Sequence, residues 1–165
     1  MADVVPRPGP EPNSAAPANP EPPLDPATIA HLRRSWAGLA PLADLFALTL
    51  YRRLFERAPH LRGLFHADIV TQGRRVFDVL DQAMARLEEP ASLRPMLEAL
   101  GRRHFHVGVQ RENFKELEAA LLQTLADLMG RSLDDELRAA WARFYGSISA
   151  VMLRGYDAIS APPAS

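Results

Sequence analysis

Residues 93–109, which read Leu-Arg-Pro-Met-Leu-Glu-Ala-Leu-Gly-Arg-Arg-His-Phe-His-Val-Gly-Val, decide the fold. His104 follows Leu100 by four residues and so continues an apolar stripe on one helical face, formed by Leu93, Met96, Leu97 and Leu100. A polar side chain buried without a partner costs roughly 1–3 kcal/mol. Taken alone, His104 is therefore either a core histidine bonded to a backbone carbonyl, which is the commoner case, or a metal ligand.

Composition excludes several function classes. The chain has 165 residues and a formal net charge of −1, so we expect neither a nucleic acid nor a membrane surface as partner. The absence of cysteine excludes disulfides, thiolate metal ligands and cysteine nucleophiles. No apolar run approaches the roughly 20 residues that span a bilayer, and the N-terminus lacks a secretory signal pattern. These features favour a cytoplasmic protein.

Proline is concentrated in residues 1–24, where small and polar residues separate it. Such a segment cannot bury enough apolar surface to offset its ordering entropy, and we expect a disordered or polyproline-like tail. It is either a passive tail or a spacer or docking arm. Residues 25–158 then form one domain, followed by a short flexible tail over 159–165.

Beyond the tail the pattern predicts only helices, so the fold class is all-α. Asp25 and Pro26 are typical of a helix start, and Ser132 with Asp135 has the spacing of a capping box. The second helix, from Pro41 to the residue before Pro59, has an apolar face of Leu45, Leu48, Tyr51, Leu54 and Phe55. The other helices are predicted over 26–39, about 68–88, 93–108, about 112–129 and from 132 onwards.

Two polar residues interrupt apolar faces. Gln72 lies in the inner face of the third helix, and Tyr51 lies among leucines and phenylalanines in the second. Each alone has an ordinary structural explanation. With His104 they place three polar groups on the inner faces of three helices, and helices packed around one metal-competent histidine are how a haem pocket is built.

Residues 27–157 resemble the globin family. Leu-Gly-Arg-Arg-His at 100–104, followed by Val-Gly-Val at 107–109, is similar to the proximal histidine and the turn after it. Pro59 with Leu64 and Phe65 resembles the short corner that packs on the haem, and Gln72 precedes His104 by the usual 32 residues. The stretch at 138–146 is similar to the last helix of bacterial single-domain globins, flavohaemoglobins and neuroglobin. The resemblance implies a globin fold, a three-over-three helical sandwich around haem b.

The resemblance also implies roles on the proximal side. His104 matches the iron ligand, and its other ring nitrogen is expected to donate to the carbonyl of Leu100, which would keep the ring neutral and oriented. Val109 would touch the haem from this side. Phe114 and Tyr156 match positions where flavohaemoglobins place a tyrosine and a glutamate around the imidazole.

On the distal side the resemblance assigns Tyr51 and Gln72 to the gas ligand. Phe65 and Val76 match residues that pack on the haem and limit the space above the iron. Arg75 matches a position that can reach a propionate, although a solvated arginine is an equally good interpretation.

Tyr51 and Gln72 both carry hydrogen-bond donors. Oxygen on ferrous iron becomes negatively charged, so each donor should stabilise it by roughly 1.5–3 kcal/mol, whereas carbon monoxide gains little. Glutamine is a poor iron ligand, which predicts a pentacoordinate ferrous iron. His66, beside Phe65, is the alternative sixth ligand if the corner swings inward.

Three functions follow in order. The first is reversible oxygen binding, with high affinity, for storage or transport, which is not an enzymatic activity. The second is nitric oxide dioxygenation. It would need a separate reductase, since the chain ends at Ser165 without a flavin domain. It ranks lower because neither Phe114 nor Tyr156 supplies a carboxylate. The third is haem-based gas sensing. The expected partners are O2, NO and CO, with a reductase in the second case.

Overall fold

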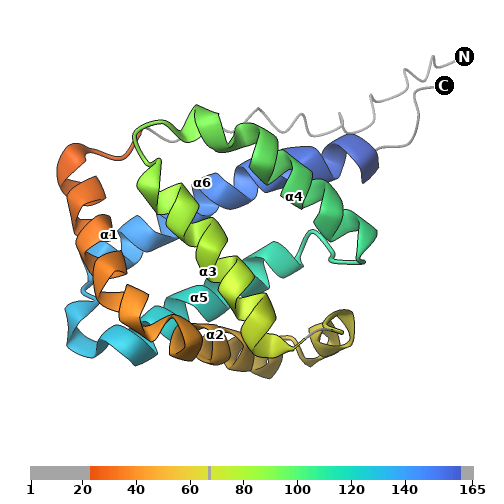
Figure 1. Ribbon diagram of the computed structural model, residues 1–165, viewed down its shortest axis with the longest axis horizontal. Coiled ribbons are helices and arrows are strands. Elements are labelled where there is room, and N and C mark those ends of the chain that lie inside the picture. The colour runs from red at the N-terminus through yellow and green to blue at the C-terminus, as the bar shows by residue number, and fades with distance from the viewer. Residues whose placement is uncertain (1–22, 67, 161–165) are drawn as a thin grey trace, which may run out of the picture.

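The computed structural model describes residues 23–66 and 68–160, and in this part of the chain every regular element is helical. The α-helices are α1 (Pro26–Leu39), α2 (Ala43–Arg57), α3 (Ile69–Ala85), α4 (Arg94–His106), α5 (Asn113–Met129) and α6 (Asp135–Ser160) (Figure 1). Short 3-10 helices connect them: η1 (Ala40–Leu42), η2 (Pro59–Leu64), η3 (Pro90–Leu93) and η4 (Gly130–Ser132). The predicted all-α class is confirmed. Residues 1–22 and 161–165, which make up most of the two predicted tails, lie outside the described residues.

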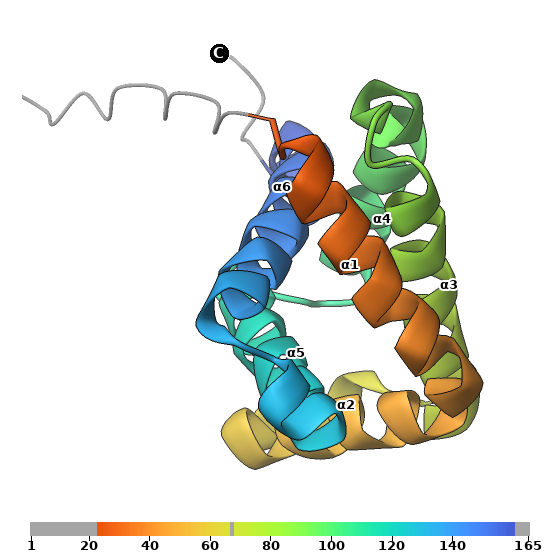
Figure 2. The ribbon, with the colours of Figure 1, turned by 90° about the vertical axis from the view of Figure 1, so that its left-hand side faces the viewer.

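The helices pack on one another in pairs. α4 packs along α6, α2 packs against α3 and α5, and α1 packs against α6 and α3. Figure 2 shows α5 and α6 in one layer and α3 and α4 in the other, with α2 along the lower edge. The two helices expected to flank the functional site, α3 and α4, thus rest on different partners.

Aromatic side chains fill the core near α1. Trp141, Phe46 and Phe144 are almost fully buried, and the ring of Trp36 stacks on that of Phe77 with their centroids 4.2 Å apart. Both indole N–H groups have acceptors, because Trp36 donates to Asp81 (2.7 Å) and Trp141 donates to Ser35 (3.1 Å). The large rings are therefore buried without an unsatisfied polar atom.

One of the two predicted N-terminal helix caps is wrong. Asp25 caps α1 as expected, since its side chain accepts the N–H of Thr28 at 3.0 Å. At α6, however, Asp134 rather than Ser132 is the cap, and its carboxylate accepts the N–H of Leu137 at 2.8 Å. Ser132 instead ends the 3-10 turn η4. Both residue types cap helices well, so the sequence pattern alone could not select between them.

The predicted apolar face of α2 is also partly wrong. Tyr51, Leu54 and Phe55 are buried, but Leu45 and Leu48 are 49% and 47% exposed. The buried positions in the first half of the helix are Phe46, Ala47, Thr49 and Leu50. Apolar residues surround most of this helix, so periodicity could not choose the face that packs on α3 and α5.

Glycine permits the closest helix contact, between α4 and α6. A Cβ atom at Gly101 would overlap the backbone of Met152, and one at Gly155 would overlap the backbone of Glu98. The two helix backbones therefore touch on both sides of this crossing, which fixes α4 and the His104 it carries relative to α6. Among the described helices none is long and apolar enough to cross a membrane.

Candidate functional site

His104 lies near the end of α4 with its ring half-buried. Its Nδ1 is 2.8 Å from the carbonyl oxygen of Leu100, one turn earlier, so Nδ1 carries the proton and donates it. This is the hydrogen bond expected from the sequence. Burial lowers the pKa of His104, partly opposed by the Leu100 hydrogen bond, while the nearby charge of Arg103 adds to the lowering. The ring is therefore neutral, and its Nε2 keeps a lone pair that no described residue uses.

The turn after α4 forms a hydrogen bond to the backbone of His104. Gly108 has a φ of +88°, a left-handed conformation that favours glycine. The turn brings the N–H of Val109 to 3.0 Å from the carbonyl of His104. The Val109 side chain is half-buried.

One aromatic ring, that of Phe114 at the start of α5, packs beside the imidazole. The Phe114 ring lies 5.8 Å from that of His104, and Tyr156 in turn packs against Phe114 at 6.3 Å. Tyr145 donates its hydroxyl proton to the carbonyl of Phe114 at 2.9 Å, which anchors the start of α5. In the described part of the chain no carboxylate bonds to His104, so its basicity is not raised by a neighbouring negative charge.

Tyr51 occupies a second, separate cluster on α2. It is 4% exposed, and its ring contacts Phe65 at 5.0 Å and Phe55 at 5.8 Å. Burial raises the pKa of Tyr51 to about 12, so the hydroxyl keeps its proton. Its hydroxyl donates to no described residue. Among the described residues, no fully buried side-chain oxygen or nitrogen lacks a hydrogen-bond partner, so the Tyr51 oxygen is not fully buried. At least part of the hydroxyl oxygen is therefore accessible to solvent, although the residue as a whole is buried.

The N-terminal half of α3 presents an apolar face that is only partly covered. The fully buried residues of α3 are Gly73 and three residues of its second half, Leu80, Ala83 and Met84. Ile69, Gln72, Val76 and Val79 remain half-buried, and the Gln72 amide has no partner among the described residues. Arg75 is exposed and makes no ion pair in the described part of the chain.

The predicted site residues thus form two groups. Tyr51 and Phe65 are in direct contact, with Gln72 and Val76 on the adjoining helix α3. Leu100, His104, Val109 and Phe114 are joined by the contacts described above. Half-buried apolar side chains, a free imidazole nitrogen on α4 and free donors on α2 and α3 together fit a flat, mostly apolar group with a metal at its centre, such as a haem.

Three contributors to this region were missed from the sequence. The sequence pattern gave Tyr145 no role at the site, although its hydroxyl bonds the Phe114 carbonyl and so holds Phe114 in place. Asn113 is buried and caps the loop by accepting the N–H of Gln110 at 2.8 Å, a role that asparagine before a helix commonly has. Gly73 lies so close to Ala47 that a Cβ would overlap it, and a glycine within a helical pattern was the one available signal.

An all-α bundle that carries a neutral histidine with a free ring nitrogen is an arrangement that can hold a haem. The globin family model matches residues 48–152. Neuroglobin of Dissostichus mawsoni is 30% identical over 139 residues, covering 76% of this chain and 87% of the relative, and neuroglobin of Tetraodon nigroviridis is 31% identical with the same coverage. Neuroglobin-2 of Oncorhynchus mykiss is 29% identical.

The chain belongs to the globin family. The predicted globin fold is confirmed, and membership of the family implies that the protein binds haem.

Proposed function

We propose that this globin binds oxygen reversibly at haem b, with His104 as the iron ligand and Tyr51 and Gln72 as donors to the gas. The observation that carries the proposal is the pair of free donors, a buried Tyr51 hydroxyl and a half-buried Gln72 amide on two helices that pack together.

The His104 ring already has the tautomer and orientation that a metal ligand needs. Its Nδ1–H is held by the Leu100 carbonyl, which sets the tautomer that leaves Nε2 as the ligand atom. The lowered pKa keeps the ring neutral, so metal binding does not compete with a proton near neutral pH. Phe114 limits rotation of the ring by packing beside it.

When bound, a ferrous haem supplies an iron that takes up diatomic gases. Tyr51 and Gln72 then discriminate among them, because a hydrogen bond to a charged acceptor contributes roughly 1.5–3 kcal/mol. Oxygen accepts such bonds strongly and carbon monoxide weakly. The raised pKa of Tyr51, about 12, keeps its hydroxyl protonated to well above neutral pH.

The other predicted residues shape the space. Phe65 packs against the Tyr51 ring at 5.0 Å and limits its rotation. Val76 and Val109 supply apolar surface from α3 and from the turn after α4, both half-buried. Arg75 has no ion-pair partner among the described residues and is available to a propionate. Gln72 is a poor iron ligand, and His66 is exposed, so we expect a pentacoordinate ferrous iron.

Nitric oxide dioxygenation with a separate reductase is the second candidate. The same Tyr51 and Gln72 donors favour it, because they would hold oxygen for reaction with nitric oxide. The aromatic residues near His104 count against dioxygenation. Phe114 packs beside the imidazole and Tyr156 packs against Phe114, and neither provides a carboxylate to raise the basicity of the imidazole. Reversible binding therefore ranks first.

Absorption spectra of the ferric, ferrous and oxygenated protein test the first proposal. We expect a pentacoordinate ferrous spectrum and a stable oxygenated form. A ferrous spectrum of two axial nitrogen ligands would contradict the proposal. Sustained nitric oxide consumption with NADH and a reductase would favour the second candidate over the first.

A further inference from the structure

Three of the four most exposed large apolar side chains in the described part of the chain lie together around the start of α2. Leu42, Leu45 and Leu48 are 39%, 49% and 47% exposed, whereas the fourth, Val107, lies apart at the end of α4. Exposed apolar side chains that lie together on a globular protein are candidates for an interaction surface.

Part of this cluster continues as a stripe along α2. Leu45, Leu48 and Arg52 are spaced three and four residues apart and so share one face of α2, and the exposed Pro41 lies in η1, immediately before α2. We call Pro41, Leu45, Leu48 and Arg52 the α2 stripe. α2 packs on α3 and α5 with its other side and runs along the lower edge of the molecule in both views (Figures 1 and 2), so the stripe faces outward.

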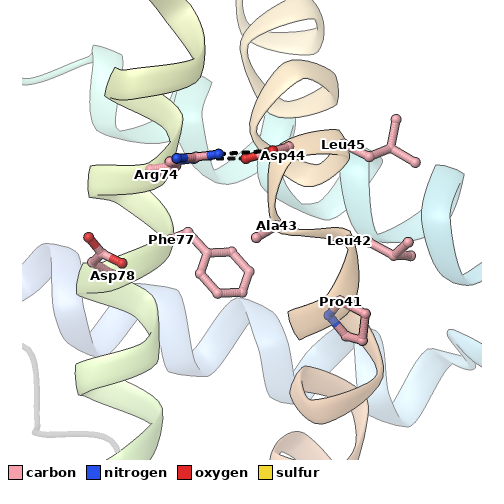
Figure 3. Close-up of a pocket in the computed structure, with 8 residues that line it drawn as sticks. All are labelled: Pro41, Leu42, Ala43, Asp44, Leu45, Arg74, Phe77 and Asp78. Carbon is pink, nitrogen blue, oxygen red and sulfur yellow. Dashed lines mark hydrogen bonds and ion pairs between the residues drawn. The ribbon is translucent and has the colours of Figure 1, made fainter.

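A groove of about 680 Å³ adjoins the Pro41 end of the stripe, between α2 and α3. In Figure 3 Leu45 points away from α3, while Asp44 and Arg74 meet across the groove with contacts of 2.9 and 3.0 Å. Asp78, also in its lining, has no hydrogen bond or ion pair to its carboxylate from any described residue. Two carboxylates and one guanidinium leave the groove negatively charged.

Arg52, at the other end of the stripe, is available for a new partner. Its side chain is 58% exposed, and its nearest carboxylate, that of Asp127, lies 3.7 Å away. Arg53 already binds that carboxylate with two shorter contacts, of 2.6 and 2.9 Å. The α2 stripe therefore has an apolar middle, a basic end at Arg52 and an acidic end at the groove.

We propose that the α2 stripe is a dimer interface with a second copy of this chain. In an antiparallel pairing of the two α2 helices, Leu45 of each copy lies opposite Leu48 of the other. The same register brings Arg52 to the N-terminal end of α2 in the second copy, where the groove lined by Asp44 and Asp78 lies.

A second copy fits this surface because the stripe is complementary to itself. A two-fold axis presents the same patch on both subunits in reversed direction, so each basic end meets an acidic end. The charge contact and the leucine contact then each form twice. Antiparallel helices also place opposite dipole ends side by side. This inference stands independently of the proposed gas-binding function.

Sedimentation velocity of the full haem-loaded chain tests the proposal, with the wild-type protein expected to be a dimer. The double variant Leu45→Gln with Leu48→Gln should raise the dimer dissociation constant by about a hundredfold or more, since four leucines per dimer lose their burial. Val107→Gln, which replaces the exposed apolar residue outside the stripe, is the control and should leave the constant unchanged. A monomeric wild-type protein at high micromolar concentration, or a dimer indifferent to the double variant, would overturn the proposal.

A charge exchange tests the register. Arg52→Glu and Asp78→Arg should each weaken the dimer by about tenfold, because each sets like charges opposite one another. The two changes combined should restore an affinity near that of the wild-type protein. A combined variant weaker than both single variants would overturn the antiparallel register, and an unchanged Soret band checks that every variant is folded.

Discussion

Gly73 on α3 packs directly against Ala47 on α2, so closely that a Cβ atom at Gly73 would overlap the Ala47 side chain. Gln72 adjoins Gly73 in the chain, and Tyr51 follows Ala47 by one helical turn. This one contact therefore sets how near the two donor-bearing helices come, and with them the Tyr51 hydroxyl and the Gln72 amide.

Gly73→Val should separate these helices. Overpacking a tight contact costs about 1–3 kcal/mol of unfolding free energy, and the displaced donors should release oxygen faster. Denaturant unfolding and stopped-flow oxygen dissociation measure the two effects. Gly146→Ala is the matched control, because a Cβ there meets no atom within 4 Å, and it should be neutral or slightly stabilising. Equal behaviour of the two variants would show that the α2–α3 contact is not limiting.

Near neutral pH, removing the donors themselves should act mainly on oxygen release. Tyr51→Phe and Gln72→Leu should each speed oxygen dissociation by about tenfold or more, since each loses a hydrogen bond of roughly 1.5–3 kcal/mol. Carbon monoxide dissociation should change far less. Tyr145→Phe serves as control, because that hydroxyl bonds the Phe114 carbonyl and is expected to affect stability and not gas release. If both distal variants keep the parental oxygen rate, the donors do not face the gas.

His104→Gly should remove the nitrogen ligand while leaving the surrounding helices intact, because Gly101 and Gly155 hold α4 on α6 independently. We expect weak haem retention and a shifted Soret band, and added imidazole should restore the band by entering the vacated space. The variant His106→Gly, at an exposed position two residues on, should bind haem as the parent does. An unaltered Soret band in His104→Gly without imidazole would contradict the assignment of the ligand.

The sequence predicted the local relationships best. Hydrophobic periodicity and Asp25-Pro26 located the helices, and the resemblance placed the Leu100 hydrogen bond of His104, because both partners lie one turn apart on the same helix. The exposed face of α2 was not predictable, since Leu45 and Leu48 are as apolar as the buried Phe46 and Leu50. Only the positions of α3 and α5 decide which side is covered.

Contacts between distant segments were also beyond the pattern. The Tyr145 hydroxyl donates to a backbone carbonyl 31 residues earlier. Every residue has a backbone carbonyl, so the sequence does not indicate which one accepts. The overlaps at Gly73 and Gly101 depend on how closely two helices cross, which a single glycine suggests but cannot specify. Relationships within one helix could thus be predicted from the sequence, whereas contacts between helices could not.

The alkaline stability of the protein should depend on Tyr51. Burial raises its pKa from 10.0 to about 12, so the native state holds the phenolic proton more tightly than the unfolded chain does. The resulting stabilisation is fully present below pH 10 and is lost as the pH rises through about 12. Two pKa units correspond to about 2–3 kcal/mol.

Urea unfolding of the parent and of Tyr51→Phe, compared between pH 8 and pH 12, isolates this contribution because the other titrating groups are common to both. We expect the parent to lose about 2–3 kcal/mol more than the variant over this interval, with most of the difference arising above the unfolded pKa of about 10. Parallel stability curves would mean that the Tyr51 hydroxyl is already well solvated in the native state. Its value as a donor in a dry pocket, on which the oxygen affinity depends, would then be lost as well.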